Sequence, residues 1–517
     1  LVQPVAAIRT PWSADVDGDG RLDVLTSTTR GFGKKPGTLL YRQTLNGFEL
    51  FNEQSGFADS HRTRGEKLGG LVSNLLHLRF AWPEDMTATN HQEFPQLADL
   101  SGNGKPGVIL YARPTRVYAI DQVPFKDISP ELGFPAVSGI TDSAVGDFDG
   151  NSQLDLYLTV GRVAQSEVVQ VGPRELRGNV LGRTRGVESD DFKSVSFQSR
   201  GDIHVDIYPV WLKLSEILIG PEGKNPSKRS FNLSPKDSSV IGKPLPGVLQ
   251  QGKAAIYYQP DTGTWTVVSC NKHNFVDFIV TSKQDIDNVT VSGFSHFQEE
   301  GVDALLMRRD ELFANEVSQS GLDFPTSCHS VVSGDFDNDM DEDLYLVCSG
   351  SVQNLPNRLY ENLGGGRFAV VSEAGGASGS RLGRGDVVAT ADYDRDGFLD
   401  LFITNGRDPA SPFAADGPHQ LFRNTGNDNH WLEIDLRGVS SNRDGIGARV
   451  VVFAGGKRQI REQGGGIHRM AQNHQRLHFG LGKNEKVDTL VITWPSGKVQ
   501  TLTDIEANQI LEVEEST

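Results

Sequence analysis

Five short stretches of the sequence carry oxygen-bearing side chains at every second position. Four of them follow the pattern Asp-x-Asp-x-Asp/Asn-x-x-x-Asp, where x is any residue. Their members are Asp15, Asp17, Asp19 and Asp23; Asp147, Asp149, Asn151 and Asp155; Asp335, Asp337, Asp339 and Asp343; and Asp392, Asp394, Asp396 and Asp400. A weaker fifth copy has Asp99, Ser101 and Asn103, with Gly107 in place of the last aspartate.

This spacing suits a hard divalent cation. Ca²⁺ takes six to eight oxygen ligands, and oxygens at positions 1, 3, 5 and 9 of a tight loop can converge on one point, with a backbone carbonyl at position 7. Without an ion, the neighbouring carboxylates would repel one another. We therefore predict about five structural Ca²⁺ sites. The alternative, a set of solvated turn aspartates, weakens with every further copy.

The loops are not EF-hands, because their twelfth position never holds the glutamate of that motif. Thr26, Leu158, Leu346 and Ile403 stand there. Short apolar runs precede and follow each loop, which predicts that each loop joins two strands of a β-hairpin. Glycine at position 6 of the first and last loops allows the sharp turn.

A second motif follows the hairpins and combines aliphatic, aromatic and charged residues, with a phenylalanine often a few positions later. It occurs at Leu39–Arg42, Arg116–Tyr118, Ala304–Arg308, Asn357–Asn362 and Gln420–Asn424. Each unit thus fits several short strands into about 50 residues, the size of one β-propeller blade. The pattern predicts an all-β fold.

The stretches Asp15–Asp23 and Asp392–Asp400 resemble FG-GAP/VCBS repeats. This resemblance implies a β-propeller that binds Ca²⁺ in loops between its strands, as integrin α-chains do. Further along, Gly445–Val450, Phe479–Gly482 and Trp494–Gly497 occur in the order found in the ASPIC/UnbV domain. The whole chain is similar to the cartilage acidic protein family and its bacterial relatives. That similarity implies a seven-bladed propeller followed by a transthyretin-like β-sandwich.

The distance from Asp147 to Asp335 is far too long for one blade. The interval has alternating strand signals such as Asp202–Tyr208 and shows no long helical pattern, which predicts an inserted β-sandwich. The predicted division is a first propeller part over 1–160, an inserted β-sandwich over 161–297, a second propeller part over 298–428 and an ASPIC/UnbV domain over 429–517.

The 517-residue chain carries 50 basic and 67 acidic side chains, a formal net charge of −17. This balance argues against nucleic acid as a partner. No apolar run approaches the roughly 20 residues that span a bilayer. The loop aspartates, counted together with Asp341, equal the net charge in number, so we interpret the acidity as metal ligands.

Several other features leave alternatives open. Cys328 and Cys348 flank one acidic hairpin, where a disulfide and two buried thiols are equally compatible with the sequence. The glycine-rich stretch Arg461–Arg469 either enters a central channel or forms a surface loop. His468, His474 and His478 favour loop or core positions over a zinc site, because no carboxylate stands at a zinc-type spacing. The Arg-Gly-Asp tripeptides Arg200–Asp202 and Arg384–Asp386 are weak adhesion signals.

No nucleophile, phosphate-binding or metalloprotease motif is recognisable, so the sequence favours a binding protein over an enzyme. We expect a secreted, extracellular or periplasmic, calcium-binding propeller that acts in binding, adhesion or assembly. Its partner would be an unidentified extracellular protein, a glycan or a second copy, with no nucleic acid and no membrane span. The alternatives are an enzyme of secondary metabolism related to UnbV-type proteins and a subunit of an extracellular polymer.

Overall fold

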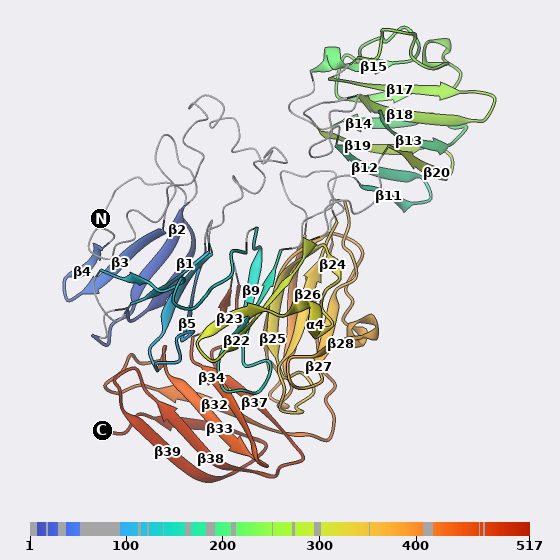
Figure 1. The fold of residues 1–517 in the computed structure, drawn as a ribbon. Helices are drawn as coiled ribbons and strands as arrows, with labels where there is room; N and C mark the ends of the chain where they lie inside the picture. Colours follow the sequence, from blue (N-terminus) through green and yellow to red (C-terminus); the bar gives the residue numbers. More distant parts are fainter. Residues whose placement is uncertain are drawn as a thin grey trace.

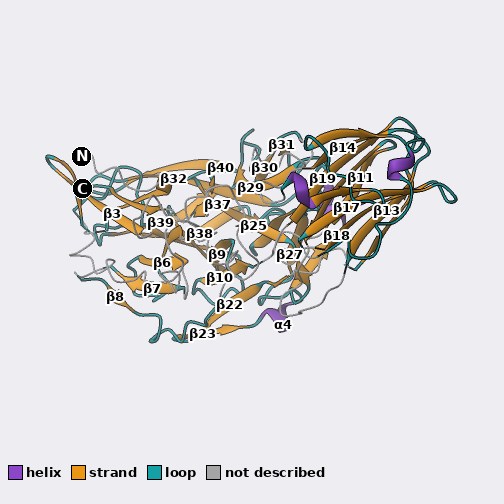
Figure 2. Ribbon diagram, turned by 90° about the horizontal axis from the view of Figure 1, so that it is seen from above, coloured by secondary structure: helices purple, strands orange, loops and turns teal. Residues whose placement is uncertain are grey.

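The computed structural model describes most of the chain outside the segment 52–93 and several shorter gaps. The described ranges are 8–16, 19–28, 38–51, 94–111, 115–120, 124–137, 139–160, 167–181, 192–207, 213–250, 252–270, 275–293, 301–350, 352–406, 417–464, 466–468 and 471–517. Within them the fold is all-β, as predicted, and helix is limited to short turns such as α4 (Val317–Ser320) (Figures 1 and 2). None of the helices described is long and apolar enough to cross a membrane.

Five antiparallel sheets follow one another outside the predicted insertion. The first two consist of β1 (Ile8–Ala14), β2 (Asp23–Thr28), β3 (Thr38–Thr44) and β4 (Gly47–Leu50), and of β5 (Phe94–Ala98), β6 (Gly107–Tyr111), β7 (Arg116–Ala119) and β8 (Lys126–Asp127). The third has β9 (Asp142–Gly146), β10 (Asp155–Thr159), β22 (Ala304–Arg309) and β23 (Leu312–Asn315). The fourth has β25 (Cys328–Gly334), β26 (Asp343–Cys348), β27 (Arg358–Asn362) and β28 (Phe368–Val371), and the fifth has β29 (Arg384–Ala391), β30 (Asp400–Gly406) and β31 (Gln420–Phe422).

Each acidic loop connects the first two strands of its sheet, as the flanking strand signals predict. The loop begins directly after the first strand, and its ninth position is the first residue of the second strand. All five loops therefore leave their sheets after the same strand. Neighbouring sheets share apolar cores, for example Tyr157 and Leu305 of the third sheet with Val331 and Leu344 of the fourth.

The first strands of the last three sheets lie side by side, with β25 between β9 and β29, and β1 lies beside β5. In the ranges described above, the hydrogen-bonded sheets remain separate and form no single closed barrel. The seven-blade count therefore stays a prediction.

Two five-stranded sheets lie between β10 and β22 in the sequence. Their strands are β11 (Glu167–Gly172), β12 (Glu175–Leu181), β19 (Phe275–Ser282), β14 (Ile203–Ile207) and β16 (Ser230–Leu233), and β15 (Ile217–Ile219), β17 (Lys253–Gln259), β18 (Thr264–Cys270), β13 (Lys193–Gln198) and β20 (Asp287–Ser292). They enclose one core around Trp265 and Phe278. Both views place them at one end of the molecule (Figures 1 and 2). The domain boundaries themselves stay predictions.

The C-terminal part forms two further sheets around a core that includes Phe479 and Trp494. One sheet has β34 (Lys457–Glu462), β33 (Arg449–Ala454), β38 (Lys486–Thr493) and β39 (Val499–Glu506), and the other has β37 (Leu477–Gly482), β32 (His430–Arg437) and β40 (Gln509–Glu514). A short hairpin of β35 (Ile467–His468) and β36 (Ala471–Gln472) leaves this unit after β34. Figure 1 shows the unit against the ends of the five sheets, at the bottom of the view.

Candidate metal centres

Three of the acidic loops bring carboxylates together. The groups are Asp147, Asp149 and Asp155; Asp335, Asp337 and Asp339; and Asp392, Asp394 and Asp400. Within each group, one oxygen from each residue lies within 4.8 Å of the others. Such an all-oxygen set suits a hard cation such as Ca²⁺. The buried Oδ1 of Asp147 has no hydrogen-bond partner in the described structure. This oxygen is therefore available as a ligand for a cation.

The first carboxylate organises each loop. The two oxygens of Asp335 accept the N–H groups of Asp339 and Met340 at 3.0 and 2.9 Å, and Asp392 accepts those of Asp396 and Gly397 at 3.1 and 2.8 Å. The loop thus wraps around its first side chain and turns the next oxygens inward.

Position 6 of every loop has a positive φ, the conformation that glycine adopts most easily. Gly20, Gly104 and Gly397 have φ values of 82°, 82° and 87°, and Ser152 and Met340 adopt 71° and 82° despite their side chains. The sharp turn predicted from the two glycines therefore occurs in all five loops.

The ninth position has a role that the sequence did not reveal. Asp343 accepts the N–H of Phe336 at 3.1 Å and that of Asn362, on the third strand β27, at 2.8 Å. The same double contact recurs at Asp23, Asp155 and Asp400. Each oxygen keeps another lone pair for a cation. The last aspartate therefore joins the loop to the third strand of its sheet as well as offering a ligand.

Burial and mutual repulsion make these carboxylates hard to ionise on their own. Burial raises the pKa of Asp343 to about 9, despite its N–H contacts and with further repulsion from Asp335. Burial and the charge of Asp339 place the pKa of Asp335 well above its ordinary value. Burial raises the pKa of Asp155 to about 8 and that of Asp147 to about 7. A divalent cation would offset this cost, because it favours the ionised form.

The second repeat motif supplies an amide that joins neighbouring sheets. The Nδ2 of Asn362 donates to the carbonyls of Phe148, in the preceding acidic loop, and Glu342, at 2.8 and 3.0 Å. Asn424 repeats the arrangement with Phe336 and Leu399 at 2.7 and 3.2 Å. In the sequence, the recurrence of Asn at the end of this motif was the one feature that could have indicated this link between sheets.

Two arginines, one directly after the second motif and one within it, reach the acidic loops. Arg309 pairs with Asp149, and Arg423 pairs with Asp394 and with Asp396, the latter at 2.8 Å. These guanidinium groups pair with Asp149 and Asp394, which are members of the carboxylate groups, and so reduce the local excess of negative charge.

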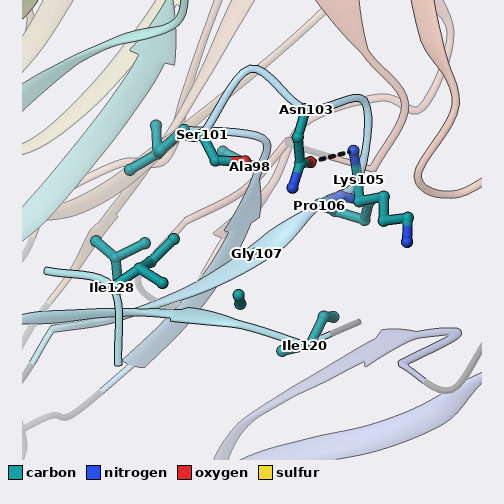
Figure 3. A pocket seen from close by; sticks show the side chains of 11 residues that line it. Ala98, Ser101, Asn103, Lys105, Pro106, Gly107, Ile120 and Ile128 are labelled. Atoms are coloured by element: carbon teal, nitrogen blue, oxygen red, sulfur yellow. Dashed lines mark hydrogen bonds between the residues drawn. The ribbon is translucent and has the colours of Figure 1, made fainter. Parts of the chain in front are cut away.

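The weak fifth loop keeps the fold but lacks the carboxylates. Asp99 accepts the N–H groups of Asn103 and Gly104 at 3.1 and 2.7 Å, and the Ser101 hydroxyl at 3.0 Å. A cation from the protein itself, Arg449, lies 3.2 Å from Asp99. Figure 3 shows that the small pocket beside the loop is lined mainly by aliphatic groups, with Ser101, Asn103 and Lys105 as polar members.

The other residues predicted from the sequence differ in how far the structure describes their contacts. Asp15 and Asp23 make the usual loop contacts and Asp19 accepts the N–H of Arg21, whereas the prediction for Asp17 lies outside the described residues. Asn151 donates to Asp149 at 3.2 Å, so its amide faces the same carboxylate group. Cys328 and Cys348 form a disulfide between β25 and β26, which settles that alternative.

Residues of both Arg-Gly-Asp tripeptides make contacts within the folded chain. Asp202 pairs with Lys283 at 2.7 Å. Gly385 of the second tripeptide packs against Val347, which a Cβ would approach to 2.7 Å. Neither contact supports an adhesion role for these sequences.

Comparisons with known proteins agree with the repeats and the C-terminal motifs. Residues 335–403 match the FG-GAP-like repeat, and residues 438–517 match ASPIC and UnbV. The predicted FG-GAP and ASPIC/UnbV resemblances are thereby confirmed.

The curated relatives are named cartilage acidic protein 1. The human protein is 28% identical over 209 residues and the Xenopus tropicalis protein 29% identical over 206 residues; both matches cover 38% of this chain. The matched region spans only 30% of the length of these relatives. Among solved structures, the Vibrio cholerae biofilm matrix protein Bap1 is 11% identical, covers 80% of this chain and 77% of its own, and has a TM-score of 0.24. A score that low carries no argument about the fold.

Proposed function

We propose that this chain is a secreted β-propeller protein, stabilised by Ca²⁺, that acts by binding an extracellular partner. The convergence of buried carboxylates in the acidic loops carries the proposal, because such groups are costly unless a cation joins them. The proposed ligands are the aspartates and Asn151 of the four full loops. The five sheets around adjoining first strands would be blades of one propeller.

The fifth loop is left out of this set of sites. It has one carboxylate, Asp99, because Ser101, Asn103 and Gly107 stand at the other ligand positions, and Asp99 is paired with Arg449. We therefore propose four cations rather than the five predicted from sequence.

Three arguments support an extracellular location. The disulfide between Cys328 and Cys348 is typical of oxidising compartments. Extracellular Ca²⁺ modules also work at the high calcium concentrations found outside cells. The names of the relatives point in the same direction.

The proposal is tested first by calcium binding and heat. Because a ligand that binds only the folded state stabilises it by mass action, saturating Ca²⁺ should raise the melting temperature by more than about 5 °C over a chelator. Isothermal titration calorimetry should count four sites. Mg²⁺ at the same concentration is the control. Unchanged melting with no calorimetric binding would refute the cation sites. A count of five would show that the fifth loop also binds a cation.

Location is tested separately in the source cells. Antibody detection after fractionation should find the protein in the medium or periplasm. Alkylation before and after reduction should show Cys328 and Cys348 oxidised. A cytosolic protein with both thiols free would contradict secretion.

A further inference from the structure

The C-terminal unit rests directly on the acidic loop 335–343. Met340 of that loop is buried in the core of the C-terminal sheets. Lys457 on β34 pairs with Asp341 at 2.9 Å, and Gly482 on β37 donates its N–H to the Asn338 carbonyl at 2.7 Å. The loop is therefore part of the surface on which this unit packs.

The closest approach involves the first carboxylate of the loop. A Cβ on Gly480 of β37 would lie 2.1 Å from Oδ2 of Asp335. Only a glycine lets the strand backbone come this near. The packing therefore depends on where the Asp335 carboxylate is held, which is also what a bound cation would fix.

The loop 392–400 meets the same unit. The Gly397 carbonyl accepts hydrogen bonds from Nε2 of His478 on β37 and from Nδ2 of Asn338, both at 3.0 Å. A Cβ on Gly397 would lie 1.9 Å from the Trp431 ring of β32. One backbone carbonyl thus ties two acidic loops to the C-terminal sheet.

Basic side chains of the C-terminal unit reach the other loops. Arg461 pairs with the buried Glu342 at 2.9 Å, and Glu342 also lies 3.4 Å from the N–H of Asp147. Arg449 joins Asp99 to the Ser152 carbonyl at 3.2 and 3.1 Å. The unit therefore contacts the third loop and the weak loop together with the two just described.

The short hairpin β35–β36 extends this contact between the sheets. His468 is buried, and its Nδ1 lies 2.9 Å from Asp142 of β9. Thr390 of β29 donates to Asn473 and accepts from the backbone of His474, both at 3.0 Å. The hairpin packs against the first strands β5, β9 and β29. Entry of the glycine-rich stretch into a central channel stays a prediction.

From these contacts we infer that the acidic loops are the docking surface of the C-terminal unit, and that a divalent cation in loops 335–343 and 392–400 holds this unit and its hairpin against the sheets. The inference rests on the proposed cation sites. Losing the cation would let the carboxylates separate, and Asp335 and Gly397 would move away from β37. The weak loop, with Arg449 in place of an ion, would be the contact that does not respond to calcium.

Limited proteolysis of the full chain tests the inference. The segment 423–429 links β31 to β32, and Asn427 and Asn429 donate to the Asp337 carbonyl at 2.6 and 2.8 Å, so these contacts should protect the partly exposed segment while the unit is docked. With excess chelator, cleavage there should be at least about tenfold faster than with saturating Ca²⁺, because local opening exposes the link. Mass spectrometry identifies the cut. Equal cleavage rates in a protein that calorimetry shows to bind Ca²⁺ would refute docking control, whereas absence of binding would refute the cation sites instead.

Two variants sharpen the test. Gly480→Ala inserts a methyl group against Asp335 and should give fast cleavage even with Ca²⁺. Gly172→Ala is the matched control, since its Cβ would meet nothing within 4 Å. Arg461→Ala removes the basic partner of Glu342 without adding a clash, and its cleavage rate should be intermediate. Protection of both interface variants to the level of Gly172→Ala would overturn the inference.

Discussion

The ninth aspartate of each full acidic loop holds together two parts of its sheet that a cation alone would not join. At Asp343 one oxygen accepts from the loop residue Phe336 and the other from Asn362 on β27. The side chain is nearly inaccessible, so water cannot replace either contact. Losing one partner of a buried charged hydrogen bond costs about 1–3 kcal/mol, beyond any ligand role.

We expect Asp343→Asn to lower the free energy of unfolding by about 2–4 kcal/mol, because the amide places an N–H₂ group opposite one of two N–H donors. Calorimetry should also show one cation fewer. Chemical unfolding at saturating Ca²⁺ measures the first effect. Asp310→Asn, in an exposed turn with a positive φ that asparagine tolerates, is the control and should change stability by less than about 0.5 kcal/mol. A loss no larger than that of the control would contradict the double role.

At the scale of elements, the third strand of a sheet also stabilises its neighbour. The buried Asn362 amide joins β27 to Phe148, which belongs to the acidic loop of the preceding sheet. Asn424 on the next unit does the same for Phe336. Adjacent sheets are therefore linked by polar contacts at the loop end in addition to their shared apolar cores.

Removing this amide should loosen two sheets at once. Asn362→Ala leaves the carbonyls of Phe148 and Glu342 without their donor, and we expect a loss of about 2–3 kcal/mol. Hydrogen exchange should rise in both β10 and β26. Glu361→Ala, at the exposed neighbouring position of the same strand, is the matched control. Faster exchange limited to β26 would show that the amide serves only its own sheet.

The hairpins and their loops could be predicted because they are local. Apolar runs flank Asp335 and Asp343 within a few residues, and the spacing of the oxygens is visible in the sequence. The contact of Asn362 with Phe148 joins residues 214 positions apart, and Arg449 reaches Asp99 across 350 positions. No periodicity records such pairs, so the links between sheets and the docked C-terminal unit required the structure.

At the scale of the whole molecule, three basic side chains of the C-terminal unit pair with acidic residues of the loops on which the unit packs. Arg449, Lys457 and Arg461 all come from β33 and β34, and each faces an acidic loop or the residue beside it. Part of the acidity behind the net charge of −17 is therefore paired within the chain, at the contact between the loops and the C-terminal unit. None of the described residues of the inserted sheets takes part in these contacts between the loops and the C-terminal unit.

The insertion should accordingly be removable. β10 and β22 are directly paired, with Leu158 opposite Ala304, and the Val160 N–H donates to Asp303 at 2.8 Å, so the cut ends already lie together. The contact of Glu167 with the Val352 N–H at 2.8 Å is one that would be lost.

Replacing residues 162–300 by a short glycine–serine linker should leave the rest folded, because closing a short loop between paired strands costs little. We expect four bound cations, protection of segment 423–429 in Ca²⁺ and a melting temperature within about 3 °C of the full chain. Calorimetry, proteolysis and thermal unfolding check these in turn. The control is the full chain, inserted sheets included, with the same glycine–serine linker added after residue 161, which shows the effect of the linker alone. If the shortened chain bound no cation or lost its protection, the inserted sheets would have to be counted as part of the calcium-dependent core.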